Sequence, residues 1–184
     1  MGSRGRADSG AMDTGTQLSC HMNRTPIGAL LLTASEEGLS GVRFLDRAPA
    51  TPRTASRARG AAHEHLRQAS SQLAEYFKGK RQRFALELDL RGTDFDCELW
   101  QLLLKIPFGR TRTYGQLAKE LGGISLARAV GGACGRNPIP VIVPCHRVIG
   151  ADRSLTGFGG GIGRKEKLLL LEGAAFGAPQ MNLF

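Results

Sequence analysis

The stretch Val143-Pro144-Cys145-His146-Arg147-Val148-Ile149-Gly150 places a cysteine beside a histidine inside an apolar, strand-like run. A thiol at neutral pH is mostly protonated, and its thiolate is the nucleophilic form. The imidazole of His146 and the cationic side chain of Arg147 are the groups in this run that could favour the thiolate. The stretch therefore indicates a reactive cysteine at position 145, and we expect the rest of the chain to fold around it.

The residues that precede this stretch predict two short helices joined by a glycine turn. Thr113 and Gln116 form a capping-box pattern that opens one helix, and Gly122-Gly123 ends it. A further helix is expected from residue 125 to about residue 135. The arrangement predicts a helix-turn-helix, although helical hairpins are also common in proteins that do not bind DNA.

Further elements are expected on either side of these helices. Thr93 begins another capping-box pattern, and the apolar helical face that follows it ends at Pro107. The β-branched run at 139–143 predicts a strand. A glycine-rich loop at 157–161 then precedes a last helix from residue 164 to about residue 171.

The amino-terminal half has a different pattern, in which strands dominate. Apolar and β-branched residues at 27–35 and 39–45 flank a short turn and predict a hairpin. The segment 48–60 contains prolines and arginines without periodicity and predicts an exposed loop. Apolar residues recur at helical spacing over 63–78, and residues 84–90 alternate like a half-buried strand.

These elements predict an α+β fold with two lobes. A small amino-terminal α/β lobe is expected over residues 23–91, and a mainly helical carboxy-terminal lobe over residues 92–184 carries the helix-turn-helix and Cys145. Residues 1–22 are rich in glycine, serine and arginine and predict a disordered tail, whose Met1-Gly2-Ser3 could derive from an expression tag.

The composition narrows the class of protein. The 184 residues include 25 Lys and Arg against 16 Asp and Glu, which leaves a net charge of +9. Such a surplus is typical of proteins that meet nucleic acid or an anionic surface, although a basic protein without such a partner remains an alternative. No apolar run is long enough for a membrane span, and no signal peptide is recognisable. We expect an intracellular protein, in the cytoplasm with the nucleoid or in a nucleus.

The cysteines and histidines do not predict a metal site. The four cysteines follow no paired spacing, so free thiols are expected. A tetrahedral site requires four ligands at a recognisable spacing, which is not found in the amino-terminal candidates Cys20, His21, His63 and His65. We therefore expect no metal and no cofactor.

The expected helix at 125–135 has a surface of very small residues. Ala127, Ala129 and Gly131 leave its backbone nearly bare, so it could approach another surface closely. The exception is Arg128, whose planar head could fill a gap in a base stack or bind phosphate. A wedge beside a reactive thiol implies base flipping. Tight helix packing and an ordinary surface arginine are the alternatives.

Taken together, these residues resemble the O6-alkylguanine-DNA alkyltransferases, also called methylated-DNA:protein-cysteine methyltransferases. The resemblance covers Gly92 to Gly173 closely, whereas the first lobe resembles the family's amino-terminal domain only in pattern. The matching motifs are, in order, Ile106-Pro107-Phe108-Gly109, Thr113-Tyr114-Gly115, Ala127-Arg128-Ala129-Val130-Gly131, Gly135-Arg136-Asn137-Pro138, Pro144-Cys145-His146-Arg147-Val148-Ile149-Gly150 and Leu155-Thr156-Gly157-Phe158-Gly159-Gly160-Gly161.

The resemblance implies direct reversal of DNA damage in a single turnover. Cys145 would displace the alkyl group from guanine O6 and keep it as a thioether. The resemblance further implies that His146 acts as a base through a water molecule and that Glu172 orients His146. Tyr114 would stabilise charge at guanine N3, and Asn137 would brace the turn at the cysteine. Without the resemblance, Glu172 would be a solvated helix-end carboxylate and Tyr114 a core tyrosine.

The resemblance also implies how the substrate is held. Backbone groups of Cys145, Val148 and Gly159 would surround the flipped base. The partner would be double-stranded DNA containing O6-alkylguanine, bound in the minor groove with little sequence preference by a monomer that could bind cooperatively. No membrane partner is expected. The expected DNA-contacting residues are Thr113, Tyr114, Ala127, Arg128, Ala129 and Gly131.

Three other functions compete with this interpretation. A lesion-binding protein would flip alkylated guanine without reacting, but its known form lacks the cysteine. A Cys-His hydrolase would usually have its cysteine and histidine far apart in sequence. A transcriptional regulator would use the helix-turn-helix for sequence-specific binding, whereas an alkyltransferase should bind with strong salt dependence and little sequence preference.

Overall fold

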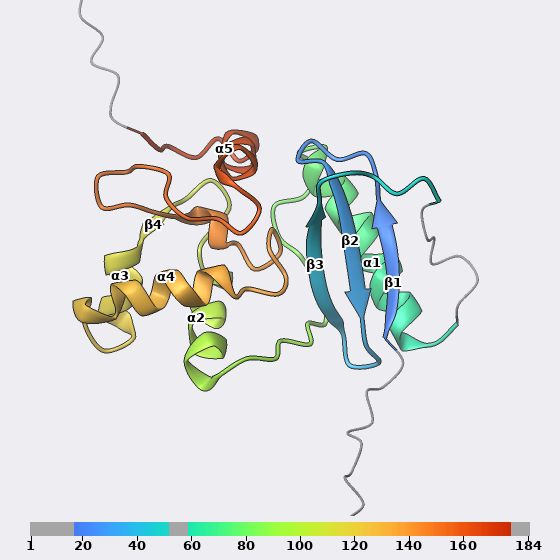
Figure 1. Ribbon diagram of the computed structural model, residues 1–184, viewed down its shortest axis with the longest axis horizontal. Helices are drawn as coiled ribbons and strands as arrows, with labels where there is room; N and C mark the ends of the chain where they lie inside the picture. Colours follow the sequence, from blue (N-terminus) through green and yellow to red (C-terminus); the bar gives the residue numbers. More distant parts are fainter. Residues whose placement is uncertain (1–16, 52–58, 178–184) are drawn as a thin grey trace, which may run out of the picture.

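The computed structural model describes residues 17–51 and 59–177, which form two lobes side by side (Figure 1). The amino-terminal lobe is a three-stranded antiparallel sheet in the order β1-β2-β3, covered on one face by helix α1. Its elements are β1 (Leu18–Met22), β2 (Ala29–Ala34), β3 (Leu39–Leu45) and α1 (Ala61–Phe77). This lobe confirms the predicted hairpin and helix.

The two periodicities of the amino-terminal lobe explain why its layers pack. In β2, Leu30, Leu32 and Ala34 are fully buried and alternate with partly exposed residues, as a strand with one covered face requires. Helix α1 buries residues three and four positions apart, namely Ala62, Leu66, Ala69, Leu73 and Tyr76. Each fully buried leucine stabilises the folded state by about 1.5 to 3 kcal/mol relative to an exposed one. The last residue of this stripe, Tyr76, faces the other lobe.

The carboxy-terminal lobe is mainly helical, as predicted. Two helices, at Tyr114–Glu120 and Ala127–Gly135, form a helical hairpin. A parallel pair of two-residue strands joins this helical hairpin to the segment that carries Cys145. The elements are α2 (Asp94–Leu104), β4 (Arg112–Thr113), α3 (Tyr114–Glu120), η2 (Ile124–Leu126), α4 (Ala127–Gly135), η3 (Cys145–Arg147), β5 (Val148–Ile149) and α5 (Ile162–Leu171).

The expected tail ends earlier than the sequence predicts. Residues 18–22 form β1, which pairs with β2 from Leu18 opposite Ala34 to Met22 opposite Leu30. The prediction is wrong here. Leu18, Cys20 and Met22 do alternate with polar residues, but this run of five residues directly follows the aperiodic tail, and its pairing with β2 shows that it is a strand. Residues 1–16, most of the expected tail, and residues 52–58 of the expected loop lie outside the described part of the chain.

Two further predicted strands are not strands. Residues 84–90 are extended and half-buried, but their backbone pairs with the sheet only around Leu88, opposite Leu39. Residues 139–143 form a turn, which a hydrogen bond from the Val143 amide to the Ile139 carbonyl closes at 2.9 Å and which the Asn137 side chain supports with two more bonds. Asn137 accepts from the Ile139 amide at 3.0 Å and donates to the Val143 carbonyl at 2.8 Å. The turn leads directly into η3 and Cys145.

The predicted cap of α2 provides a test of local stability. The Thr93 hydroxyl accepts a hydrogen bond from the Asp96 amide at 3.2 Å and so satisfies one of the free donors at the helix start. Replacement by alanine, Thr93→Ala, should lower the free energy of unfolding by about 1 kcal/mol in urea denaturation. The control Thr93→Ser keeps the hydroxyl and should stay close to wild type. Equal losses in both variants would contradict the capping role.

Candidate active site

Cys145 is the first residue of η3 and lies at the base of a recess between the two lobes. Its side chain is almost fully buried, with 5% exposed. Two cavities of about 180 and 190 Å³ reach it. Both are lined by Cys134, Gly135, Phe158 and Gly159 together with Cys145. The sulfur is therefore enclosed, yet it faces open space of the size that a small group would occupy.

The amino-terminal sheet supplies one wall of this recess. Phe44 of β3 lines the first cavity and packs on Phe158 with ring centroids 5.5 Å apart. Arg164 of α5 stacks over Phe44 and donates to the Ile27 carbonyl at 2.8 Å and to the Gly160 carbonyl at 2.9 Å. One arginine thus fastens the sheet to the glycine-rich loop beside Cys145.

The environment of the Cys145 thiol favours its protonated form. Burial raises its pKa to about 11, although the hydrogen bond from Asn137 and the positive charge of Lys165 act in the opposite direction. The Asn137 amide nitrogen lies 3.1 Å from the sulfur. A thiol with such a pKa is protonated at neutral pH, so another group has to remove its proton before it can act as a nucleophile.

Lys165 is a charged residue at the site that sequence reasoning missed. It is fully buried on α5, and its ammonium donates to the carbonyls of Val148 at 2.6 Å and Thr156 at 2.7 Å. Burial lowers its pKa to about 8. One signal was present in the sequence, because Lys165 lies three and four residues before the buried Leu168 and Leu169, on the core face of the helix.

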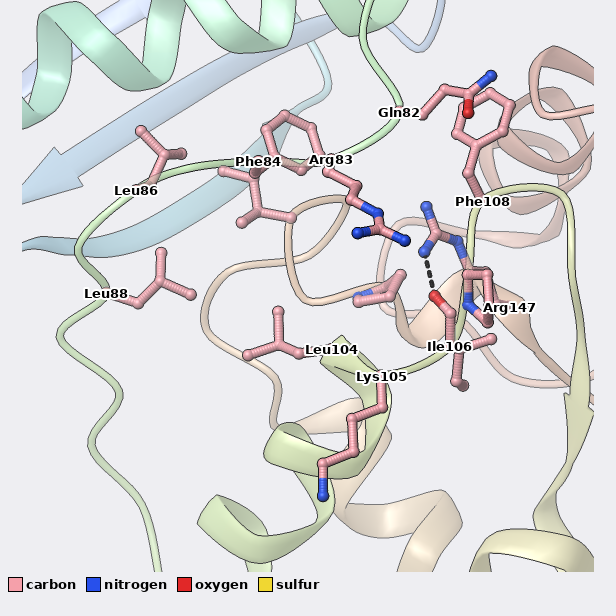
Figure 2. Close-up of a pocket in the computed structure, with 13 residues that line it drawn as sticks. Gln82, Arg83, Phe84, Leu86, Leu88, Leu104, Lys105, Ile106, Phe108 and Arg147 are labelled. Atoms are coloured by element: carbon pink, nitrogen blue, oxygen red, sulfur yellow. Dashed lines mark hydrogen bonds between the residues drawn. The ribbon is translucent and has the colours of Figure 1, made fainter.

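The prediction that Arg147 favours the thiolate is wrong. Its guanidinium points away from the sulfur and donates to Glu172 from Nε at 2.8 Å and from Nη2 at 2.9 Å. Its Nη1 donates to the Ile106 carbonyl, and the Phe108 ring lies beside it with its centroid 6.0 Å away (Figure 2). An opposite charge within reach decides where a buried guanidinium points, and Glu172 provides that charge.

Glu172 is the most extensively bonded side chain of the site. Besides Arg147, its oxygens accept from His146 Nε2 at 2.8 Å, from the Tyr76 hydroxyl at 2.7 Å and from the Gly109 amide at 3.2 Å. Burial would raise its pKa, but the bonds from His146 and Arg147 outweigh burial and hold the pKa at about 2. Glu172 is therefore a buried carboxylate and not a solvated one.

A close approach of the backbone makes one of these bonds possible. Gly109 has a φ of 72°, in the left-handed region, and a Cβ built there would lie 2.8 Å from the Glu172 carbonyl oxygen. Only glycine tolerates both conditions.

His146 is held in one orientation and is neutral. It is fully buried, and burial lowers its pKa although Glu172 acts to raise it. Because Nε2 faces the Glu172 carboxylate, Nε2 carries the proton and Nδ1 carries the lone pair. Nδ1 is buried and has no hydrogen-bond partner among residues 17–51 and 59–177. The ring can therefore accept a proton at Nδ1.

Tyr114 opens α3 and faces the loop beside the second cavity. Its hydroxyl donates to the Thr156 carbonyl at 3.0 Å, with the Gly157 carbonyl at 3.4 Å. Its ring lies 5.9 Å from the Lys165 ammonium. Tyr114 and Lys165 therefore lie behind Gly157, which lines the second cavity, and neither of them lines either cavity itself.

The predicted DNA-contacting residues of α4 lie outside its buried face. Arg128 and Ala129 of α4 are exposed, and Ala127 and Gly131 are half-buried. The opposite face of α4 buries Val130, Ala133 and Cys134 against the core. Thr113 uses its side chain to cap α3, where both hydrogen bonds of the predicted capping box are present.

The two other predicted substrate-binding residues are placed differently. Gly159 is exposed and lines both cavities beside Cys145. Val148 is fully buried in β5, and its carbonyl already accepts a hydrogen bond from Lys165. The structure thus brings Gly159 to the recess, whereas the Val148 side chain belongs to the core.

The described residues, 17–51 and 59–177, contain no group of three or more His, Cys, Asp or Glu side chains that could hold a metal ion. Nor do they contain a helix that is long and apolar enough to cross a membrane.

Comparison with known proteins agrees with the sequence resemblance. The family described as 6-O-methylguanine DNA methyltransferase matches twice, with its ribonuclease-like domain over residues 18–90 and its DNA binding domain over residues 94–174. A methylated-DNA--protein-cysteine methyltransferase of Mycobacterium bovis is 49% identical over 148 residues, which cover 80% of this chain and 88% of the relative. One of Methanosarcina acetivorans is 46% identical over 82% of this chain and 95% of its own.

Solved structures are similar over most of the chain. The O6-methylguanine methyltransferase of Mycobacterium tuberculosis has a TM-score of 0.72 and 44% identity, covering 86% of this chain and 93% of its own. A complex of the Mycobacterium tuberculosis protein OGT with DNA has a TM-score of 0.70 and 47% identity, covering 83% of this chain and 91% of that one.

The low pKa of Glu172 predicts a pH-dependent contribution to stability. Because its ordinary pKa of 4.5 falls to about 2 on folding, the stabilisation is complete above pH 4.5 and is lost as the pH falls toward 2. The difference in unfolding free energy between wild type and Glu172→Gln should therefore narrow by on the order of 2 kcal/mol between pH 7 and pH 3, where the group has lost only part of its stabilisation. Urea denaturation between pH 7 and pH 3 measures it. The control Glu166→Gln, an exposed change on α5, should follow wild type, and a difference that does not vary with pH would contradict the assignment.

Proposed function

Because the chain belongs to the 6-O-methylguanine DNA methyltransferase family, we propose that it repairs DNA by transferring the alkyl group of O6-alkylguanine to Cys145. The observation that carries the choice of residue is the position of Cys145, which lines both cavities of the recess and directly precedes His146, the partner of Glu172. The product is a thioether, which has no leaving step toward water, so each molecule reacts once.

The buried histidine is the proposed base. The lone pair on His146 Nδ1 accepts the proton of Cys145 through a water molecule, and the Glu172 carboxylate stabilises the imidazolium that results. The thiolate then forms a bond to the alkyl carbon while the bond from that carbon to guanine O6 breaks. The electron pair of the broken bond passes to the guanine ring, and the guanine anion takes up one proton, which balances the proton that His146 removed from Cys145. A protonated resting thiol fits this order of events, because deprotonation is coupled to the reaction.

Tyr114 is proposed to stabilise the charge that develops on guanine. To donate to guanine N3, its hydroxyl must leave the Thr156 carbonyl, to which it donates in the free protein. That carbonyl also accepts from Lys165 at 2.7 Å, so it remains hydrogen-bonded after the exchange. Backbone groups of Cys145, Val148 and Gly159 are proposed to hold the base edges.

DNA is proposed to bind along the exposed side of α4. The nearly bare surface of Ala127, Ala129 and Gly131 suits close contact with the minor groove, with Thr113 and Tyr114 at the start of the neighbouring helix. The net charge of +9 favours binding of a polyanion with little sequence preference. We propose a monomer on DNA, acting where the DNA of the cell lies, in the cytoplasm with the nucleoid or in a nucleus.

The central experiment identifies the alkylated residue. After incubation with a duplex that contains O6-methylguanine, mass spectrometry should find one methyl group on the peptide that carries Cys145. Cys145→Ala should bind the duplex and remove no methyl group, because the acceptor atom is missing. The matched control Cys97→Ala removes a half-buried cysteine from α2 and should retain transfer. Methyl transfer by the Cys145 variant, or an unmodified Cys145 in wild type, would contradict the proposal.

A second experiment tests Arg128 as the residue that fills the gap left by the flipped base. Arg128→Ala should slow transfer from duplex DNA on the order of tenfold or more, because unstacking a base costs a few kcal/mol that the wedge offsets. Transfer from the free O6-alkylguanine base should change little. Arg67→Ala removes the same charge from α1 in the other lobe and serves as the control. Equal losses with duplex and free base would argue against the wedge.

A further inference from the structure

The last turn of α1 reaches from the amino-terminal lobe to Glu172 of the other lobe. Tyr76 is fully buried, and its hydroxyl donates to Glu172 Oε1 at 2.7 Å across 96 residues of sequence. The two family matches end at residue 90 and begin at residue 94, so this hydrogen bond joins the two matched domains. The amino-terminal lobe thus supplies a hydrogen-bond donor to the carboxylate that orients His146.

Three donors share the same oxygen of Glu172. Oε1 accepts from Tyr76 at 2.7 Å, from His146 Nε2 at 2.8 Å and from Arg147 Nη2 at 2.9 Å. Burial, followed by the charge of Glu172, raises the pKa of Tyr76 far above its usual value. The phenol therefore keeps its proton at neutral pH and acts as a hydrogen-bond donor to Glu172.

The Tyr76 ring is held by aromatic neighbours. The rings of Phe77 and Phe84 each lie 5.4 Å from it, and the ring of Phe108 lies 6.1 Å away, centroid to centroid. Phe84 and Phe108 also border a cavity of about 560 Å³ between the lobes, next to Arg147 (Figure 2). Packing therefore fixes the direction of the phenol, and its hydroxyl is aimed at Glu172 before any substrate binds.

We propose that Tyr76 is a positioning residue for the alkyl transfer, an inference that rests on the function proposed above. Its hydroxyl fixes the orientation of the Glu172 carboxylate and takes up part of its negative charge. In this way Tyr76 sets how strongly His146 holds a proton.

The direction of the effect follows from the charges around His146. The groups that act on the imidazole are the Glu172 carboxylate, the Arg147 guanidinium and the Lys165 ammonium. Without the Tyr76 donor, more of the Glu172 charge is available to stabilise the imidazolium, so the pKa of His146 rises. The base is then protonated, and inactive, up to a higher pH.

The test compares pH profiles of single-turnover methyl transfer. In Tyr76→Phe the ring remains and the donor is lost, so the acid limb should move upward by about half a pH unit to one unit. The control Phe84→Leu loosens the packing around the same ring without removing the hydroxyl. Its profile should keep the wild-type midpoint even if the variant is less stable. Tyr76→3-fluorotyrosine, with a more acidic phenol, should move the limb downward and tests the idea in a protein of unchanged shape.

Titration of the His146 ring by NMR in unreacted protein gives a reading that needs no DNA. Tyr76→Phe should raise the pKa of His146 in this measurement as well. An unchanged acid limb and an unchanged His146 pKa in both Tyr76 variants would overturn the role, and so would an equal shift in Phe84→Leu. Because wild type must transfer methyl groups in the same assay, failure of the proposed function would be seen separately.

Discussion

One buried carboxylate, that of Glu172, connects the two lobes and holds His146. It accepts hydrogen bonds from α1 through Tyr76, from η3 through His146 and Arg147, and from the backbone of Gly109. A buried charge requires full pairing, and loss of one partner typically costs about 3 to 5 kcal/mol because the other is left uncompensated. The contact between the lobes and the orientation of the proposed base therefore depend on the same group.

The surroundings of the Cys145 sulfur are determined more by the turn that precedes it than by the residues next to it in sequence. Asn137 shapes the turn at residues 139–143 and also donates to the Cys145 sulfur. Burial keeps the resting thiol protonated, and the protonated form is the weaker nucleophile. The sequence indicates Cys145 but assigns Arg147 to it wrongly, since adjacency along the chain says nothing about a carboxylate 25 residues away. The catalytic and DNA-binding roles remain predictions from the family resemblance.

How well the sequence predicts an element depends on how far away its partners lie. The caps at Thr93 and Thr113 involve neighbours three residues away, and the structure confirms both. The strand at 18–22 has the alternation of a strand, but the run is short and follows the aperiodic tail, and only its pairing with β2 distinguishes it from that tail. Lys165 and Tyr76 bond to groups 17 and 96 residues distant, and no local pattern identifies such contacts. Local chemistry predicted the helices and the strands of the hairpin, whereas the partners of the buried polar groups required the folded chain.

The recess at Cys145 has walls from both lobes, since Phe44 of the sheet packs on Phe158 and Arg164 fastens the two together. The size of the cavity at the Cys145 sulfur therefore depends on how the two lobes pack against each other. Substitutions in the sheet, remote from the reacting atoms in sequence, would then widen or narrow the range of adducts that fit. For the proposed alkyl transfer, the size of the accepted group could then change although Cys145, His146 and Glu172 stay the same.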